Sequence, residues 1–107
     1  MTTVTYYPKQ YRMTIVGHAG YDFPGEDIVC AGISTLMSTL VAASPNEPEY
    51  QTSLYINHET AEIDIQSDPH EGFEDKCQTV YDTIYQGYLT VEESYPEYLK
   101  VTGGYHG

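Results

Sequence analysis

The sequence is poor in basic residues and in cysteine, has no long apolar run, and contains no tryptophan. Its 107 residues include four Lys and Arg against 16 Asp and Glu, so the formal charge at pH 7 is −12. With no basic stripe to neutralise phosphates, direct binding of nucleic acid or of an anionic membrane surface is disfavoured. The negative field instead attracts a basic partner, and we expect that association to weaken with salt.

Other absences bear on the cellular setting. No segment approaches the roughly 18 apolar residues of a membrane-spanning helix, and residues 1–7 lack the charged and apolar parts of a signal peptide. We therefore expect a cytoplasmic protein, in which Cys30 and Cys77 are free thiols rather than a disulfide. The length fits a single domain over residues 1–107. Twelve tyrosines favour amphipathic packing over a binding surface.

The hydrophobic pattern predicts an α+β fold in the order ββαββαβ. Extended, β-branched runs predict an opening hairpin, a second hairpin and a last strand, over Thr2–Tyr7, Tyr11–Gly17, Tyr50–Asn57, Thr60–Gln66 and Tyr98–Thr102. Apolar residues three and four positions apart predict two helices, one from Asp27 to the break at Ser44 and one of about 16 residues from Phe73. Because regular βαβ alternation is absent, we expect a mainly antiparallel sheet with both helices packed on one face.

The most distinctive segment runs from Gly17 to Ala31. It places His18 where a predicted strand ends and Cys30 in the first turn of the predicted helix. Free N–H groups and the positive dipole end of a first turn favour a thiolate and could hold an oxyanion. A nearby imidazole could accept the thiol proton, and the resulting pair attacks carbonyl carbons. The alternative is that Cys30 is a small, partly buried apolar side chain at the edge of the helix stripe.

Asp27 lies three residues before Cys30, on the same side of the predicted helix. One interpretation is a helix cap, in which the carboxylate accepts the amide N–H of Cys30. The other is an orienting group for an imidazolium or for a substrate amine. The two roles are compatible, and the sequence leaves both open.

The remaining cysteine and histidines indicate no further chemistry. Cys77 falls on the apolar face of the second predicted helix, so we expect it in the core. His58, His70 and His106 make no metal-ligand spacing with either cysteine. We therefore expect no metal site and no other cofactor.

Taken together, the motifs of this segment resemble the ribosomal-processing cysteine protease family, Prp. The resemblance rests on three features, namely Gly17-His18-Ala19, Gly25 and Asp27-Ile28-Val29-Cys30-Ala31, with His18 and Cys30 twelve positions apart. It implies one cysteine endopeptidase domain in which His18 is the catalytic base, Cys30 the nucleophile and Asp27 the third residue of the pattern. It also implies a substrate loop made of Gly20, Tyr21, Asp22, Phe23, Pro24 and Gly25.

The resemblance further implies a substrate and an assembly. Members of the family remove a short N-terminal extension from bacterial large-subunit ribosomal protein twenty-seven, a basic protein. The resemblance also implies that this chain forms a homodimer. Gly32 departs from the family pattern, which commonly has a second alanine there, and Pro24 stiffens the loop. Two alternatives stay open: a phage or prophage homologue that processes a phage protein, and a non-catalytic acidic module that binds a basic ribosomal protein.

Overall fold

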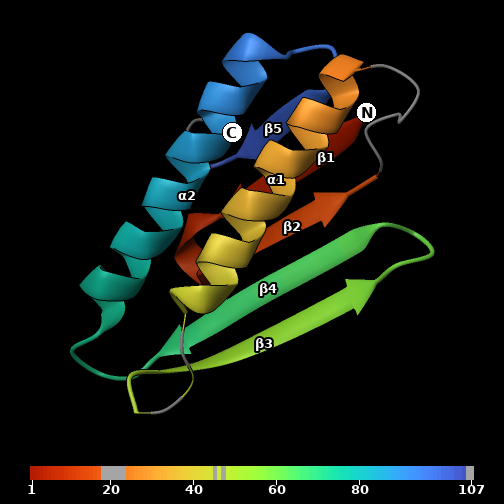
Figure 1. The fold of residues 1–107 in the computed structure, drawn as a ribbon. Helices are drawn as coiled ribbons and strands as arrows, with labels where there is room; N and C mark the ends of the chain where they lie inside the picture. Colours follow the sequence, from red (N-terminus) through yellow and green to blue (C-terminus); the bar gives the residue numbers. More distant parts are fainter. Residues whose placement is uncertain (18–23, 45, 47, 106–107) are drawn as a thin grey trace.

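The chain forms five strands, two long helices and one short helical turn in the predicted order (Figure 1). The computed structural model describes residues 1–17, 24–44, 46 and 48–105, with the backbone alone for residues 24–27. The elements are β1 (Thr2–Tyr7), the 3₁₀ turn η1 (Pro8–Gln10), β2 (Arg12–Val16), α1 (Pro24–Ala42), β3 (Tyr50–Asn57), β4 (Glu62–Pro69), α2 (Glu74–Ser94) and β5 (Leu99–Gly103). No helix in these ranges is long and apolar enough to cross a membrane.

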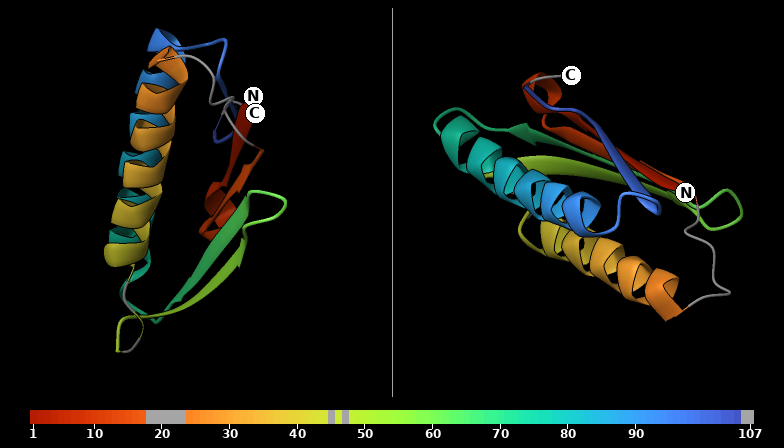
Figure 2. Two further views of the ribbon diagram at one scale, coloured as in Figure 1. Left: turned by 45° about the vertical axis from the view of Figure 1, so that its right-hand side comes forward. Right: turned by 90° about the horizontal axis from the view of Figure 1, so that it is seen from above.

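The strands make one mixed sheet in the spatial order β3-β4-β2-β1-β5. Three of its four strand pairs are antiparallel, and only β1 and β5 run parallel. Both helices lie on the same face of this sheet, side by side and antiparallel to each other (Figure 2). The predicted α+β class and the single helical layer are confirmed.

The core lies between the sheet and the helices. Buried side chains alternate along β1 and β2 and face apolar stripes of the helices; they include Val4, Tyr6, Met13, Ile15, Val29, Ile33, Met37, Leu40, Cys77, Tyr81 and Tyr88. Two of the buried tyrosines have hydrogen-bond partners: the Tyr88 hydroxyl donates to the Ile33 carbonyl at 2.9 Å, and the Tyr81 hydroxyl lies 2.9 Å from Ser67 Oγ. The buried hydroxyl of Tyr50 has no such partner among the described residues. The rings of Tyr81 and Tyr88 therefore pack in the core as the composition predicts, and their hydroxyl groups bond to protein atoms rather than to water.

Several predicted boundaries were wrong. Helix α1 begins at Pro24 rather than Asp27, because proline has a fixed φ and no N–H and so suits the first helical position. Strand β4 continues past Gln66 to Pro69, since buried Ser67 is paired through its hydroxyl with Thr52 at 3.0 Å. Helix α2 extends to Ser94, beyond the predicted length of about 16 residues.

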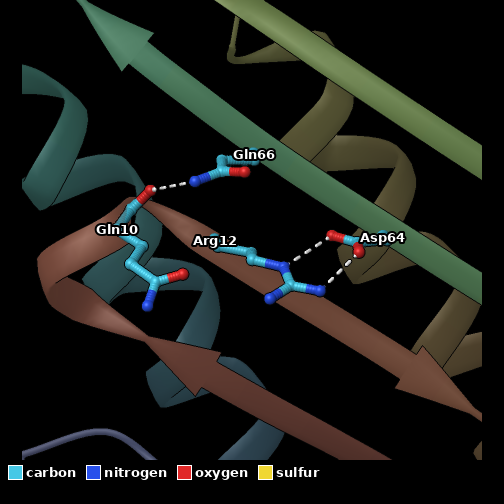
Figure 3. Close-up of polar contacts among 4 residues, drawn as sticks. All are labelled: Gln10, Arg12, Asp64 and Gln66. Carbon is cyan, nitrogen blue, oxygen red and sulfur yellow. Dashed lines mark hydrogen bonds and ion pairs between the residues drawn. The ribbon is translucent and has the colours of Figure 1, made fainter.

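The sheet face opposite the helices is polar. Arg12 on β2 donates to both carboxylate oxygens of Asp64 on β4, at 2.7 and 3.0 Å, and Gln66 donates to the Gln10 carbonyl at 3.3 Å (Figure 3). The Arg12 guanidinium also lies over the Tyr7 ring, 5.0 Å from its centre. Because about a third of each charged side chain is exposed, this pair contributes at most about 1 kcal/mol.

Candidate active site

Cys30 borders a cavity of about 310 Å³ between the N-terminal half of α1 and the sheet. Its side chain is half-buried, in contrast to the fully buried Cys77. The walls come from α1, from the ends of β2 and β4, and from the β3–β4 hairpin; they include Ile15, Ile33, Ser34, Ile56, His58 and Ile63. A thiol is thus presented to a largely apolar hollow that has polar groups at its rim.

Gly17 lines the same cavity and is fixed from both sides. Its N–H donates to the Ala61 carbonyl at 3.1 Å, and its own carbonyl accepts the Thr2 hydroxyl at 3.3 Å. Its φ of +96° is one that side-chain-bearing residues rarely adopt, and a Cβ here would lie 2.7 Å from the Met1 carbonyl oxygen. Glycine is therefore required at this point, where the chain leaves β2.

The predicted site residues fall into two groups. His18 and the loop residues Gly20, Tyr21, Asp22 and Phe23 lie outside the described residues. Pro24 and Gly25, which we predicted to belong to that loop, instead form the first turn of α1. The prediction of a loop was wrong for these two positions, because glycine and proline are also compatible with a helix start.

The early helix start changes the expected roles of Asp27 and Cys30. Cys30 is the seventh residue of α1 and lies in its second turn, so its N–H belongs to the helical ladder. The N–H groups without helical partners belong to the first four residues. Asp27 is the fourth residue of α1 and is not its N-cap. The predicted first-turn position of Cys30 and the capping role of Asp27 were therefore wrong.

Cys77 lies in the core, as predicted. No part of its side chain is exposed, and it packs beside Tyr81 and other buried residues of α2 and the sheet. Burial raises the pKa of the Cys77 thiol to about 11, and a hydrogen bond with Ser67 only partly opposes this. At neutral pH this thiol is un-ionised and inaccessible, so it has the properties of a structural cysteine.

His58 lies at the rim of the cavity that Cys30 borders, a placement that sequence reasoning missed. Asn57 builds the turn that carries it, because its side-chain oxygen accepts the Glu59 and Thr60 N–H groups at 3.0 and 3.3 Å. The hairpin was predicted, but only the placement of α1 on the sheet brings its tip to Cys30. Within the described ranges, no group of three His, Cys, Asp or Glu side chains could hold a metal ion.

Comparison with known proteins gives one family and several structures. The family model described as cysteine protease Prp matches residues 1–100. An essential ribosomal processing protease Prp from S. aureus, solved with a covalently linked product peptide, is 25% identical with a TM-score of 0.77, over 97% of this chain and 100% of that one. SMU.848 from Streptococcus mutans is 24% identical with a TM-score of 0.73, over 95% and 90% of the two chains. No curated protein sequence matches significantly.

Proposed function

The chain belongs to the cysteine protease Prp family, and from this we propose that it is an endopeptidase with Cys30 as nucleophile and His18 as general base. The observation that carries the proposal is the position of Cys30, half-buried on the wall of a cavity of about 310 Å³. The other thiol, Cys77, is fully buried and has no route to a substrate.

The position of Gly17 supports His18 as the partner of Cys30. Gly17 lines the same cavity, and three hydrogen-bonded or steric constraints fix it there. His18 is the next residue in the chain, and consecutive Cα atoms are about 3.8 Å apart. The proposed base therefore directly follows, in the sequence, a residue that lines the cavity of Cys30.

The proposed reaction has two stages. The imidazole accepts the thiol proton, and the thiolate attacks the carbonyl carbon of the scissile peptide bond. The C–N bond then breaks as the imidazolium gives its proton to the leaving amine, which leaves an acyl group on the Cys30 sulfur. Water, deprotonated by the same imidazole, releases the acyl group and restores the thiol.

Two further parts of the proposal concern residues around Cys30. Asp27 lies one helical turn before Cys30, and with the capping role excluded we assign it an orienting role towards the imidazolium. Residues Gly20 to Phe23 lie between His18 and α1 in the sequence, and we propose that they contact the bound peptide together with Pro24 and Gly25 in the first turn of the helix.

The proposed substrate is the N-terminal extension of bacterial large-subunit ribosomal protein twenty-seven. The formal charge of −12 supports a basic partner, and the similar S. aureus protein is a ribosomal processing protease.

The setting would then be the cytoplasm, and the family resemblance leads us to propose a homodimer, which sedimentation equilibrium tests. Because the field acts at long range, raising the salt concentration should weaken cleavage of the whole basic protein more than cleavage of its isolated extension.

The decisive experiment incubates the protein with a synthetic peptide that spans the extension and follows cleavage by mass spectrometry. Wild type should cleave it, whereas Cys30→Ala and His18→Ala should lose activity at least about a thousandfold. Cys77→Ala, checked to be folded, is the matched control for loss of a thiol and should retain activity. Undiminished cleavage by Cys30→Ala would refute the mechanism, and binding without cleavage by wild type would favour the non-catalytic module.

A further inference from the structure

The outer half of β3 is an uncovered sheet edge next to the cavity of Cys30. Strand β3 is the edge strand on its side of the sheet, and its residues Leu54, Tyr55 and Ile56 are 44%, 54% and 46% exposed. No residue from Tyr50 to Asn57 is charged, in a chain with a net charge of −12. Sheet edges usually carry lysine, proline or an inward charge that prevents pairing with another strand, and this edge has none of them.

The hydrogen-bond pattern identifies which backbone groups of β3 are free. The Thr52 N–H donates to the Asn46 side chain at 2.6 Å, so the backbone N–H of Thr52 points away from β4. In an antiparallel pair this orientation alternates, and the register pairs Leu54 with Ile65 and Ile56 with Ile63. The N–H and C=O groups of Leu54 and Ile56 therefore also point away from β4, towards the open edge.

Two other edge amides of the described sheet are covered by side chains. Asn46 covers Thr52 at the inner half of β3, and on β5, at the opposite edge, Glu92 accepts the Val101 N–H at 2.6 Å. Within the described ranges, no side chain or loop makes a hydrogen bond to the amides of Leu54 and Ile56. The bare part of the edge is therefore the part beside Cys30.

Two of the exposed side chains on this edge, Leu54 and Ile56, lie on the sheet face that carries the Cys30 cavity. Tyr50 faces the helices and is fully buried, and because side chains alternate along a strand, Leu54 and Ile56 lie on this helix-covered face. Ile56 itself lines the cavity with Cys30. Tyr55 lies on the opposite, polar face of the sheet. Leu54 and Ile56 thus extend the apolar cavity wall along the edge of the sheet.

We propose that the substrate binds as an added strand along β3, pairing its backbone with Leu54 and Ile56 while apolar side chains at alternate substrate positions pack beside these two residues and lead the scissile bond to Cys30. The proposal rests on the proposed protease function and specifies its substrate as an extended segment with apolar residues two positions apart. Backbone pairing supplies affinity, and the alternate side chains supply specificity.

The test measures binding to the Cys30→Ala protein, so that it is separate from cleavage, using the extension peptide and copies N-methylated at one residue each. N-methylation should weaken binding at alternate residues only, because every second N–H of an added strand pairs with the edge. On peptide binding, the Leu54 and Ile56 amides should gain protection from hydrogen exchange. Leu54→Ser should weaken binding about tenfold, as expected for the lost burial of one leucine side chain.

Tyr55→Ser is the matched control, because Tyr55 is adjacent and also exposed but faces the other side of the sheet. The affinity of this variant for the extension peptide should stay within about twofold of that of the Cys30→Ala protein without the second substitution. Peptide binding without protection of Leu54 and Ile56, or no binding at all, overturns the added strand, while cleavage by wild type decides the protease function separately. Protection of these amides that rises with protein concentration alone would assign the edge to a second copy of the chain and also overturn the proposal.

Discussion

Replacing Gly17 by alanine tests how firmly the end of β2 is held at the candidate site. Gly17 and Gly72 have nearly the same φ, +96° and +94°, but a Cβ on Gly17 would lie 2.7 Å from the Met1 carbonyl oxygen, whereas a Cβ on Gly72 would have no neighbour within 4 Å. Gly72→Ala therefore includes the cost of the left-handed backbone alone, about 1 kcal/mol. In Gly17→Ala the backbone must also shift, which weakens the hydrogen bonds with Ala61 and Thr2. At about 1 kcal/mol for each bond, the total is about 3 kcal/mol.

Urea denaturation of both variants measures this difference. A gap of about 2 kcal/mol with a slope of about 2 kcal/mol per molar urea places the midpoint of Gly17→Ala about 1 M below that of Gly72→Ala. Mass spectrometry verifies that both proteins retain Met1. Peptide cleavage under folded conditions should fall for Gly17→Ala and stay near wild type for Gly72→Ala, because only Gly17 precedes His18 and lines the cavity. Equal midpoints would refute the steric reasoning, and equal activities would refute the role of Gly17 in the site.

Three further predictions concern the two thiols and the helix pair. Iodoacetamide at neutral pH should modify half-buried Cys30 at least about tenfold faster than buried Cys77, and mass spectrometry should find equal rates in denaturant; equal native rates would contradict the assignment. Burial raises the pKa of the Cys77 thiol from 9.0 to about 11 in the folded state. Deprotonation of this thiol therefore favours the unfolded state, so its contribution to stability is complete below pH 9 and is lost as the pH rises towards 11. The unfolding free energy of wild type should therefore fall by about 2 kcal/mol more than that of Cys77→Ala between pH 8 and 11, and parallel curves would exclude this linkage. Tyr88→Phe removes the buried bond to the Ile33 carbonyl and should cost about 1 kcal/mol in urea denaturation, against less than about 0.5 kcal/mol for exposed Tyr55→Phe; similar losses would mean that the buried bond contributes nothing.

The sequence predicts the element order because apolar periodicity changes clearly between strands and helices. It predicts β1 and β3 to the residue, but it misses the end of β4, since Ser67 and Asp68 look like a polar break. Ser67 is buried only because Thr52 and Tyr81 satisfy its hydroxyl, and these partners lie 15 and 14 positions away. Local pattern cannot reveal a polar residue that distant partners make buriable.

The candidate site shows the same division. Motif and resemblance point to Cys30, and the structure puts it on a cavity wall. The start of α1 was missed because Pro24 and Gly25 fit a loop and a helix start equally well by composition. His58 and the free edge of β3 depend on strand order, which periodicity does not contain. Which strand is the edge follows only from the complete sheet.

Strand β1 pairs with β2, which follows it directly, and with β5, near the other end of the described chain. This topology determines the order in which the two pairs form during synthesis. Thr5 on β1 meets Thr102 on β5 across 97 positions of sequence, whereas β1 and β2 are joined by a short turn. Closing so long a loop is entropically costly and slow, so the β1·β5 pair forms after the local hairpins. Until residues 99–103 have left the ribosome, one side of β1 remains unpaired beside the wall of the Cys30 cavity to which Thr2 contributes. The strand that carries Thr2 is therefore paired on both sides only after β5 has been translated.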